Sequence, residues 1–154
     1  MTHPNEDTAE QEFRITAEQL LQFDAPDGST PDEFRIGDLS REFGVTLRTL
    51  RFYEDRGLLS PERRGTTRIY SRRDRMRLRL VLLAKILGFS LTEAKQLIDI
   101  YHQPDGRRRQ AKTALVRFEE QRLILEEQRR EIEESLEAMR VTTDYVRDYL
   151  AKLG

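Results

Sequence analysis

The pattern that most constrains this chain is a run without helix breakers near its C-terminal end. Neither glycine nor proline, the two residues that most disfavour a helix interior, occurs from Arg107 to Leu153. Apolar side chains recur there at alternating spacings of three and four residues, namely Leu115, Phe118, Leu125, Ile132, Leu136, Met139, Val146, Leu150 and Leu153. Arg122, Arg129 and Thr143 fill the remaining positions. Such a ladder is typical of a coiled-coil seam and predicts one long helix.

This helix alone would leave its apolar stripe in water, so the ladder predicts a homodimer. The residues expected at the dimer interface are Leu115, Phe118, Leu125, Ile132, Leu136 and Met139. Acidic residues flank the ladder and can pair with its arginines, across two helices or along one. The alternative is a helix that folds back on the N-terminal part of the chain. The ladder leaves the orientation of the two helices open.

The net charge of −1 hides a strong asymmetry along the chain. Residues 1–34 contain nine acidic side chains and one basic one, residues 35–85 contain six acidic and fourteen basic ones, and residues 86–154 contain thirteen acidic and twelve basic ones. The central segment therefore carries a charge of +8 and follows a segment of −8. A basic block of this kind is the electrostatic footprint of nucleic-acid binding. The acidic segment is either a solubilising tail or a mimic of DNA that covers the basic face.

The basic block contains two short helical patterns joined by a glycine turn. Ile36, Leu39 and Phe43 recur at helical spacing and predict a first helix over 36–43, which Gly44 ends. A second helix is expected over 46–56, with Thr46 as its N-cap and Gly57 at its end. Cations interleaved with aromatic residues stand on the second helix, at Arg48, Arg51, Phe52 and Tyr53. The layout predicts a helix-turn-helix that reads double-stranded DNA.

An arginine-rich hairpin and two more helices should follow. Gly65 lies near the expected tip of the hairpin, with arginines on both strands and Tyr70 on the returning one. Ser71 with Asp74, and Ser90 with Glu93, have the spacing of residues that cap helix starts. The side chains expected to point inward from the third helix are Met76, Leu80, Leu83 and Leu87.

Two runs, IGDLSREFGVTLRTLRFYEDRGLLSPERR and RIYSRRDRMRLRLVLLAKILGFSLTEAKQLI, resemble the MerR family of bacterial transcription regulators. The resemblance covers about residues 34–101. The absence of cysteine, the wing sequence RRGTTRIYS and the short C-terminus are similar to the branch of the family that controls branched-chain amino-acid and fatty-acid catabolism in proteobacteria. The family resemblance implies a mainly α fold, in which a winged helix-turn-helix DNA-binding domain is followed by a long dimerisation helix that forms an antiparallel coiled coil. The domains expected are an acidic flexible arm over 1–33 with at most one helix, the DNA-binding domain over 34–103 and the coiled-coil helix over 104–154.

The resemblance also implies a mechanism. Dimers of this family bind a pseudo-palindrome in a promoter whose two elements are too far apart, and they bend and untwist the DNA so that RNA polymerase engages both. The alternative is an architectural DNA-binding protein that does not regulate promoters. Activation or repression, the operator and any small-molecule effector stay open. A regulator of this kind acts in the bacterial cytoplasm, on the nucleoid.

At the positions that match the family pattern, the resemblance implies that Thr46, Arg48 and Thr49 begin the recognition helix and face the major groove. Arg48 or Arg51 is expected to contact a guanine while the other holds a phosphate. The Tyr53 hydroxyl can donate a hydrogen bond to a phosphate, but the Phe52 ring cannot. The alternative role for Phe52 is packing beneath the wing. The wing residues, which should lie over the backbone or the minor groove, are Arg63, Arg64, Arg68 and Tyr70. Glu54 and Asp55 are expected to orient arginines through salt bridges within the domain.

Other classes of function lack support in the sequence. The chain contains no cysteine, and His3 and His102 are its only histidines, so we expect no metal site and no cofactor. No glycine-rich phosphate loop or nucleophile with a nearby base suggests an enzyme. No apolar run approaches the length needed to span a membrane.

Overall fold

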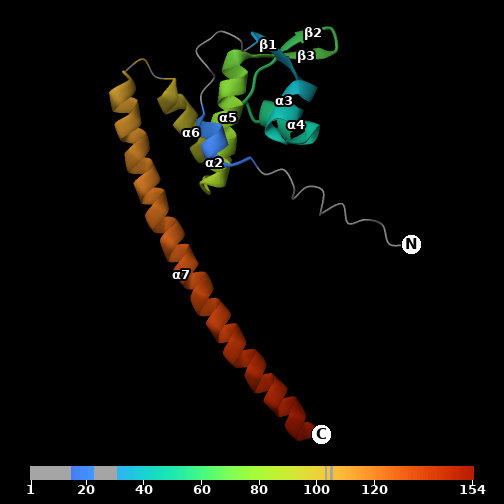
Figure 1. Cartoon of the computed structure of the whole chain (residues 1–154), viewed down its shortest axis with the longest axis vertical. Helices are drawn as coiled ribbons and strands as arrows, with labels where there is room; N and C mark the ends of the chain where they lie inside the picture. Colours follow the sequence, from blue (N-terminus) through green and yellow to red (C-terminus); the bar gives the residue numbers. More distant parts are fainter. Residues whose placement is uncertain (1–14, 23–30, 103, 105) are drawn as a thin grey trace, which may run out of the picture. The chain divides into compact units, whose positions relative to one another are not determined.

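The computed structural model describes residues 15–22, 31–102, 104 and 106–154. The chain divides into two compact units, residues 1–103 and residues 104–154. Each unit is mainly helical, and a small antiparallel sheet belongs to the first (Figure 1).

The first unit contains the helix-turn-helix that the sequence predicted. Helix α3 spans Ile36–Phe43, and Gly44 ends it at φ 64°, a left-handed conformation that favours glycine. Helix α4 spans Leu47–Asp55 and begins at Thr46, whose side chain accepts a hydrogen bond from the Thr49 N–H. Both predicted helices and the predicted N-cap are confirmed.

The sheet that forms the wing has the strand order β1-β3-β2. Strand β1 covers Glu33–Arg35, β2 covers Glu62–Arg64 and β3 covers Thr67–Ser71. Strands β2 and β3 form the predicted hairpin, with Arg63 opposite Arg68, and Gly65 lies in its turn at φ 64°. The central strand β3 also pairs with β1, which places Phe34 opposite Tyr70. The wing is therefore fastened to the segment that leads into α3.

Two further helices complete the first unit, which we call the basic unit because its segment 35–85 carries a charge of +8. Both predicted capping boxes are present. Helix α5 spans Arg72–Ile86, with reciprocal hydrogen bonds between Ser71 and Asp74. Helix α6 spans Leu91–Tyr101, with the same arrangement between Ser90 and Glu93. The two helices pack against each other.

The predicted inward face of α5 is confirmed in part, because Leu80 and Leu83 pack against the main core and Leu87 packs against a smaller cluster of buried residues. The apolar side chains that α5 buries are Leu78, Val81, Leu82 and Ala84. Those expected inside are only partly buried, namely Met76, Leu80, Leu83 and Leu87. Helix α5 packs against α6, β1, β3 and α2, a short helix over Ala17–Leu21, so neighbours cover a broad band of its surface and not a single stripe. Periodicity alone cannot place the centre of such a band.

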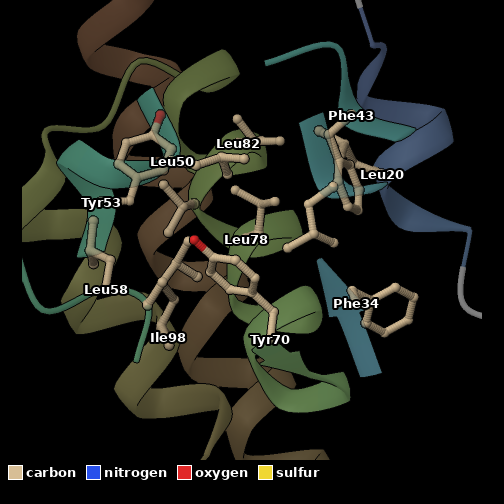
Figure 2. Packing of buried hydrophobic residues seen from close by; sticks show 13 residues of the cluster. Leu20, Phe34, Phe43, Leu50, Tyr53, Leu58, Tyr70, Leu78, Leu82 and Ile98 are labelled. Atoms are coloured by element: carbon tan, nitrogen blue, oxygen red, sulfur yellow. The ribbon is translucent and has the colours of Figure 1, made fainter. Parts of the chain in front are cut away.

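One core joins these elements. It includes Leu39 and Leu50, both fully buried, with Leu78 and Ile98 from the later helices. Figure 2 shows the Tyr70 ring directed into this cluster. Burial of apolar side chains of this size contributes about 1.5–3 kcal/mol each, which fixes the outward faces of α4 and the wing.

The segment preceding the sheet is part of the fold. Helix α2 spans Ala17–Leu21, is closed by a capping box between Thr16 and Gln19, and packs against α5. Leu20 is 3% exposed and belongs to the main core. The expected arm over 1–33 thus includes a docked helix and the beginning of β1, and the rest of that prediction falls on residues 1–14 and 23–30, outside the described residues.

The second unit is a single long helix. Helix α7 spans Arg107–Leu153, as the breaker-free run predicted. All six predicted interface residues are exposed in this single chain, from 38% for Phe118 to 64% for Leu136 and Met139. The apolar ladder is therefore uncovered and available for a second helix.

Candidate nucleic-acid interface

The N-terminal turn of α4 is exposed to solvent and is capped by Thr46. Thr46 Oγ1 lies 3.1 Å from the Thr49 amide nitrogen and 2.9 Å from Thr49 Oγ1. Leu50 and Tyr53 are buried and fasten the opposite side of the helix to the core. Because a helix turns by about 100° per residue, Arg48, Arg51 and Phe52 share the outward face. All three of these side chains are exposed.

The tyrosines predicted to contact DNA lie in the core. Tyr53 is 3% exposed, and Tyr70 is fully buried with its hydroxyl oxygen lacking a hydrogen-bond partner within the described structure. Burial raises the pKa of both phenols. A phosphate would have to displace core side chains to reach Tyr70, so its position does not support the predicted contact of Tyr70 with DNA. The position of Tyr53 likewise does not support the predicted donation to a phosphate.

Phe52 does not pack beneath the wing. Its side chain is 41% exposed, and the Arg56 guanidinium carbon lies 5.1 Å from the centre of its ring. A cation above an aromatic face is stabilised by about 0.5–1 kcal/mol at an exposed site. Phe52 therefore holds a cation beside the outward face of α4, although it cannot donate a hydrogen bond itself.

Glu54 connects α4 to both strands of the hairpin. Its Oε2 lies 2.7 Å from Arg68 Nε, and its Oε1 lies 3.2 Å from an Arg63 terminal nitrogen. Burial raises the pKa of Glu54, but the hydrogen bonds from Arg68 and Arg63 outweigh it, so that the pKa falls below its usual value. The prediction that Glu54 orients arginines is confirmed for both partners. We call these three residues the Glu54 clamp.

The third wing arginine has a different anchor. Arg64 donates two hydrogen bonds to the carboxylate of Glu33, at 2.6 and 3.1 Å, and so links β2 to β1. The hydrogen bond from Arg64 lowers the pKa of Glu33. Both side chains are about half exposed. A guanidinium has five N–H donors, so each wing arginine keeps donors for a phosphate while its partner fixes its direction.

A cationic cleft lies between α3, α4 and the hairpin. It has a volume of about 430 Å³, and its charged lining consists of Arg35, Arg41, Arg51 and Arg68 with one carboxylate, Asp38. Thr66 from the hairpin turn and Thr67 from the start of β3 add hydroxyl groups. A concave surface with a net charge of +3 suits a phosphate of the DNA backbone. Arg35 and Arg41 were not among the predicted contacts, because they precede the recognition helix and only the folding of α3 beside the wing brings them to it.

Several arginines of α5 serve the fold. Arg75 is 8% exposed and donates to both carboxylate oxygens of Glu42, with its guanidinium over the rings of Phe34 and Phe43. Arg79 is also 8% exposed. These two side chains are therefore buried parts of the fold and add little to the exposed basic surface.

Within residues 15–22, 31–102, 104 and 106–154, no three potential metal ligands among His, Asp and Glu come together. In the same part of the chain, no helix is both long and apolar enough to cross a membrane.

Family models agree with the geometry. Residues 34–99 match the model described as MerR HTH family regulatory protein, and residues 75–145 match the model described as MerR, DNA binding. Together the two matches run through the helix-turn-helix, the wing and much of α7. The chain belongs to the MerR family.

Curated MerR-type relatives share the basic unit. The HTH-type transcriptional regulator HmrR of Rhizobium leguminosarum bv. viciae is 41% identical over 71 residues, which are 46% of this chain and 55% of the relative. The HTH-type transcriptional regulator ZntR of Escherichia coli (strain K12) is 36% identical over 74 residues, 47% of this chain and 52% of the relative. These relatives are named as regulators and not as enzymes. The chain matches only about half the length of either relative.

Solved MerR-type structures resemble a larger part of the chain. A MerR family transcriptional regulator from Bacillus cereus aligns with a TM-score of 0.57 and 28% identity, over 70% of this chain and 77% of that one. The N-terminus of MtaN, the multidrug transporter activator of Bacillus subtilis, aligns with a TM-score of 0.56 and 27% identity, over 71% of this chain and 96% of that one. The winged helix-turn-helix is therefore the fold of the basic unit.

Proposed function

We propose that this chain is a sequence-specific, DNA-binding transcriptional regulator that acts as a homodimer on a pseudo-palindromic promoter site. The observation that carries the proposal is the outward face of α4. Arg48 and Arg51 are both exposed there, one helical turn apart, and among the described residues neither forms an ion pair. A basic surface of this kind fits the phosphates and base edges of a DNA groove better than it fits a neutral or basic protein partner.

The two arginines have separate roles in this proposal. Arg48 stands in the first turn of α4, where a recognition helix approaches base edges, and it donates two hydrogen bonds to a guanine. Arg51 also lines the cationic cleft, so it holds a backbone phosphate together with the wing. Thr46 and Thr49 contact the DNA near the helix start, while Arg63, Arg64 and Arg68 follow the backbone.

Binding of the Arg48→Ala variant tests this assignment. A guanine contact is worth about 1–3 kcal/mol, so affinity for the selected site should fall about five- to 150-fold, whereas affinity for scrambled DNA falls only a few-fold. Arg108→Ala, which removes an exposed arginine from the first turn of α7, is the control of equal charge. Fluorescence anisotropy on both duplexes provides the measurement. Equal losses on the two duplexes would refute base reading by Arg48.

The uncovered ladder of α7 supports dimerisation, and its neighbouring charges favour an antiparallel pair. If Leu115 faces Leu153 of the other helix, every ladder position meets another ladder position, with Ile132 beside Leu136 at the centre. On one flank, Glu119 then faces Arg147 and Glu126 faces Arg140 of the other helix. Each exposed pair contributes about 0.2–1 kcal/mol, and each occurs twice by symmetry.

Other pairings are less favourable. A parallel pair in register would place Arg122 against its own copy and Arg129 against its own copy inside the seam. An antiparallel pair shifted by one heptad so that Leu115 faces Val146 would set Glu126 against Glu133 and leave Leu150 and Leu153 unpaired, and the opposite shift would leave Leu115 and Phe118 unpaired. The favoured pairing sets only Glu133 against its own copy, at an exposed flank where the repulsion is small.

Cross-linking distinguishes these arrangements, because the chain has no native cysteine. In the favoured pairing Ser135 lies beside its own copy near the two-fold axis, so the Ser135→Cys protein should form a disulfide-linked dimer on mild oxidation. Leu125→Cys would do so only in a parallel pair. A dimer from Leu125→Cys, or none from Ser135→Cys in a protein that sediments as a dimer, would refute the pairing.

We also propose the mode of regulation that the family resemblance implies. The dimer bends and untwists the spacer of a promoter so that RNA polymerase engages both elements, in the bacterial cytoplasm and on the nucleoid. Such deformation costs about 1–10 kcal/mol in elastic estimates, which phosphate contacts from the clefts and wings offset. Genomic binding followed by footprinting tests this. Sites within long promoter spacers would support regulation, and scattered sites without promoter bias would favour the architectural alternative.

A further inference from the structure

The basic unit has a second hollow, which shares no lining residue with the cationic cleft. It has a volume of about 260 Å³ and is lined by residues of α4, α5 and α6 and of the turn between the last two. Four of the lining side chains are buried core residues, namely Tyr53, Val81, Phe89 and Ala94. Phe52 adds an exposed aromatic ring. The hollow is thus mainly apolar and opens beside the recognition helix.

One charged side chain lines this hollow. Lys85, in the last turn of α5, is exposed, and it takes part in no ion pair within the described part of the chain. The remaining polar side chains of the lining are the hydroxyls of Thr49 and Tyr53. Small-molecule sites combine an apolar wall with a few polar groups that fix orientation, and this hollow is slightly smaller than the usual range of about 300–1,000 Å³.

We propose that this hollow binds a small carboxylic acid with a compact apolar body, such as an aromatic acid, and that Lys85 pairs with its carboxylate. The aromatic and aliphatic lining accepts the apolar body, and the single cation selects an anion over a neutral or cationic molecule. A small acid with one ring fits the hollow of about 260 Å³, which is smaller than the usual site of a drug-sized ligand. The side chain of a partner protein is the competing occupant, and the single lysine beside an apolar wall favours the free acid.

The site is placed to act on DNA reading. Thr49 and Phe52 line the hollow, and each is adjacent in sequence to an arginine of the outward face of α4, Arg48 or Arg51. A ligand between α4 and α6 therefore touches the recognition helix directly. This regulatory step rests on the proposed function, whereas binding of the acid does not.

Binding can be tested on the whole chain without DNA. Phenylacetate is titrated to about 10 mM into the ¹⁵N-labelled protein, because a ligand this small binds weakly. We expect saturable shifts in the amide resonances of Phe52, Lys85, Phe89 and Ala94. Phenylacetamide, which has the same ring and no charge, should bind about three- to fivefold more weakly. No saturable shift, shifts confined to α7, or equal binding of the two compounds would overturn the proposal.

Three variants locate the site. Lys85→Gln should reduce phenylacetate affinity about three- to fivefold and leave phenylacetamide unchanged. Lys95→Gln removes an exposed lysine of α6 that does not line the hollow, and it should change neither affinity. Ala94→Leu should fill the hollow and abolish binding of both compounds, with circular dichroism showing that the fold persists. Equal effects of the two lysine variants would refute the role of Lys85.

Coupling to DNA is measured separately. Phenylacetate should change the dissociation constant for the selected DNA site at least about threefold, and DNA should change phenylacetate affinity by the same factor, as linkage requires. Binding without coupling would refute the regulatory step and leave the ligand site. If the protein without phenylacetate bound the selected site no more tightly than scrambled DNA, the proposed function would be refuted instead.

Discussion

The Glu54 clamp gives the sharpest test of how the wing is built. Glu54→Gln keeps the shape of the side chain and removes the charge that holds Arg63 and Arg68. The Glu54 and Arg68 side chains are only 19% and 20% exposed, whereas Arg63 is 52% exposed. A hydrogen bond between largely covered charged groups contributes about 1.5–3 kcal/mol, and an exposed pair contributes about 0–1 kcal/mol. Because glutamine keeps one acceptor, we expect a loss of about 1–2 kcal/mol, mainly through Arg68.

Urea denaturation at neutral pH provides the measurement, with Asp55→Asn as the control. Asp55 is the next residue of α4, is exposed, and forms no ion pair among the described residues. The control should change the unfolding free energy by less than about 0.5 kcal/mol. Equal stabilities of the two variants would refute the clamp as a stabilising contact.

The contribution of Glu54 should also depend on pH with a defined sign. Its pKa is lowered from 4.5 in the folded protein, so the unfolded chain binds the proton more readily. The stabilisation is therefore complete above the unfolded value and is lost as the pH falls through the lower folded value. The stability difference between wild type and Glu54→Gln should be constant from pH 7 to about pH 5 and shrink below about pH 4. A difference that grew in acid would contradict this account.

The same variant separates orientation from charge in DNA binding. Removing a negative charge beside the wing strengthens the attraction to any DNA. Releasing Arg63 and Arg68 also lets these two side chains adopt more orientations, which weakens their positioning on the DNA. Binding to scrambled DNA should therefore tighten, and the ratio of specific to non-specific affinity should fall. Asp55→Asn should tighten both without changing the ratio. An unchanged ratio for Glu54→Gln would show that the clamp does not position the wing.

Three further substitutions test the fold beneath the interface. Tyr70→Phe removes a buried hydroxyl without a described partner, so stability should stay equal or rise by up to about 1 kcal/mol in urea denaturation, and DNA affinity should not change; a loss of affinity would restore Tyr70 to the interface. Arg75→Ala should cost about 2–4 kcal/mol, because it removes packing on two rings and leaves Glu42 without this partner. Leu20→Ala should cost about 2–4 kcal/mol, against less than about 0.5 kcal/mol for the 54% exposed Leu21→Ala; equal effects would show that α2 does not hold the core.

The local order of elements was predictable because short-range chemistry decides it. Thr46, Ser71 and Ser90 each accept a hydrogen bond from the backbone N–H three residues later, and Gly44 takes the left-handed conformation. These contacts depend on neighbours in sequence, so spacing alone reveals them. The long helix followed for the same reason from the absence of breakers.

The faces of the elements were less predictable because they depend on partners far along the chain. Tyr70 stands in a strand that alternates sides, and only the pairing of β3 with both β1 and β2 determines that its ring enters the core. Helix α2 is only five residues long, and it joins the fold through Leu20, which packs into a core formed by later segments of the chain. No local pattern marks either contact.

The arginines show why a charge count is an incomplete guide to a DNA-binding surface. The segment 35–85 carries +8, yet Arg63, Arg64, Arg68 and Arg75 each contact a carboxylate of the same unit. A planar guanidinium can stack on an aromatic ring, hold a carboxylate and still present further donors, so one residue type serves both the core and the interface. Arg75, 8% exposed, belongs to the core, whereas Arg64, 52% exposed, can still reach a phosphate. Counterion release on binding should therefore follow the exposed guanidinium groups of α4, the wing and the cleft, and not the charge of the whole segment.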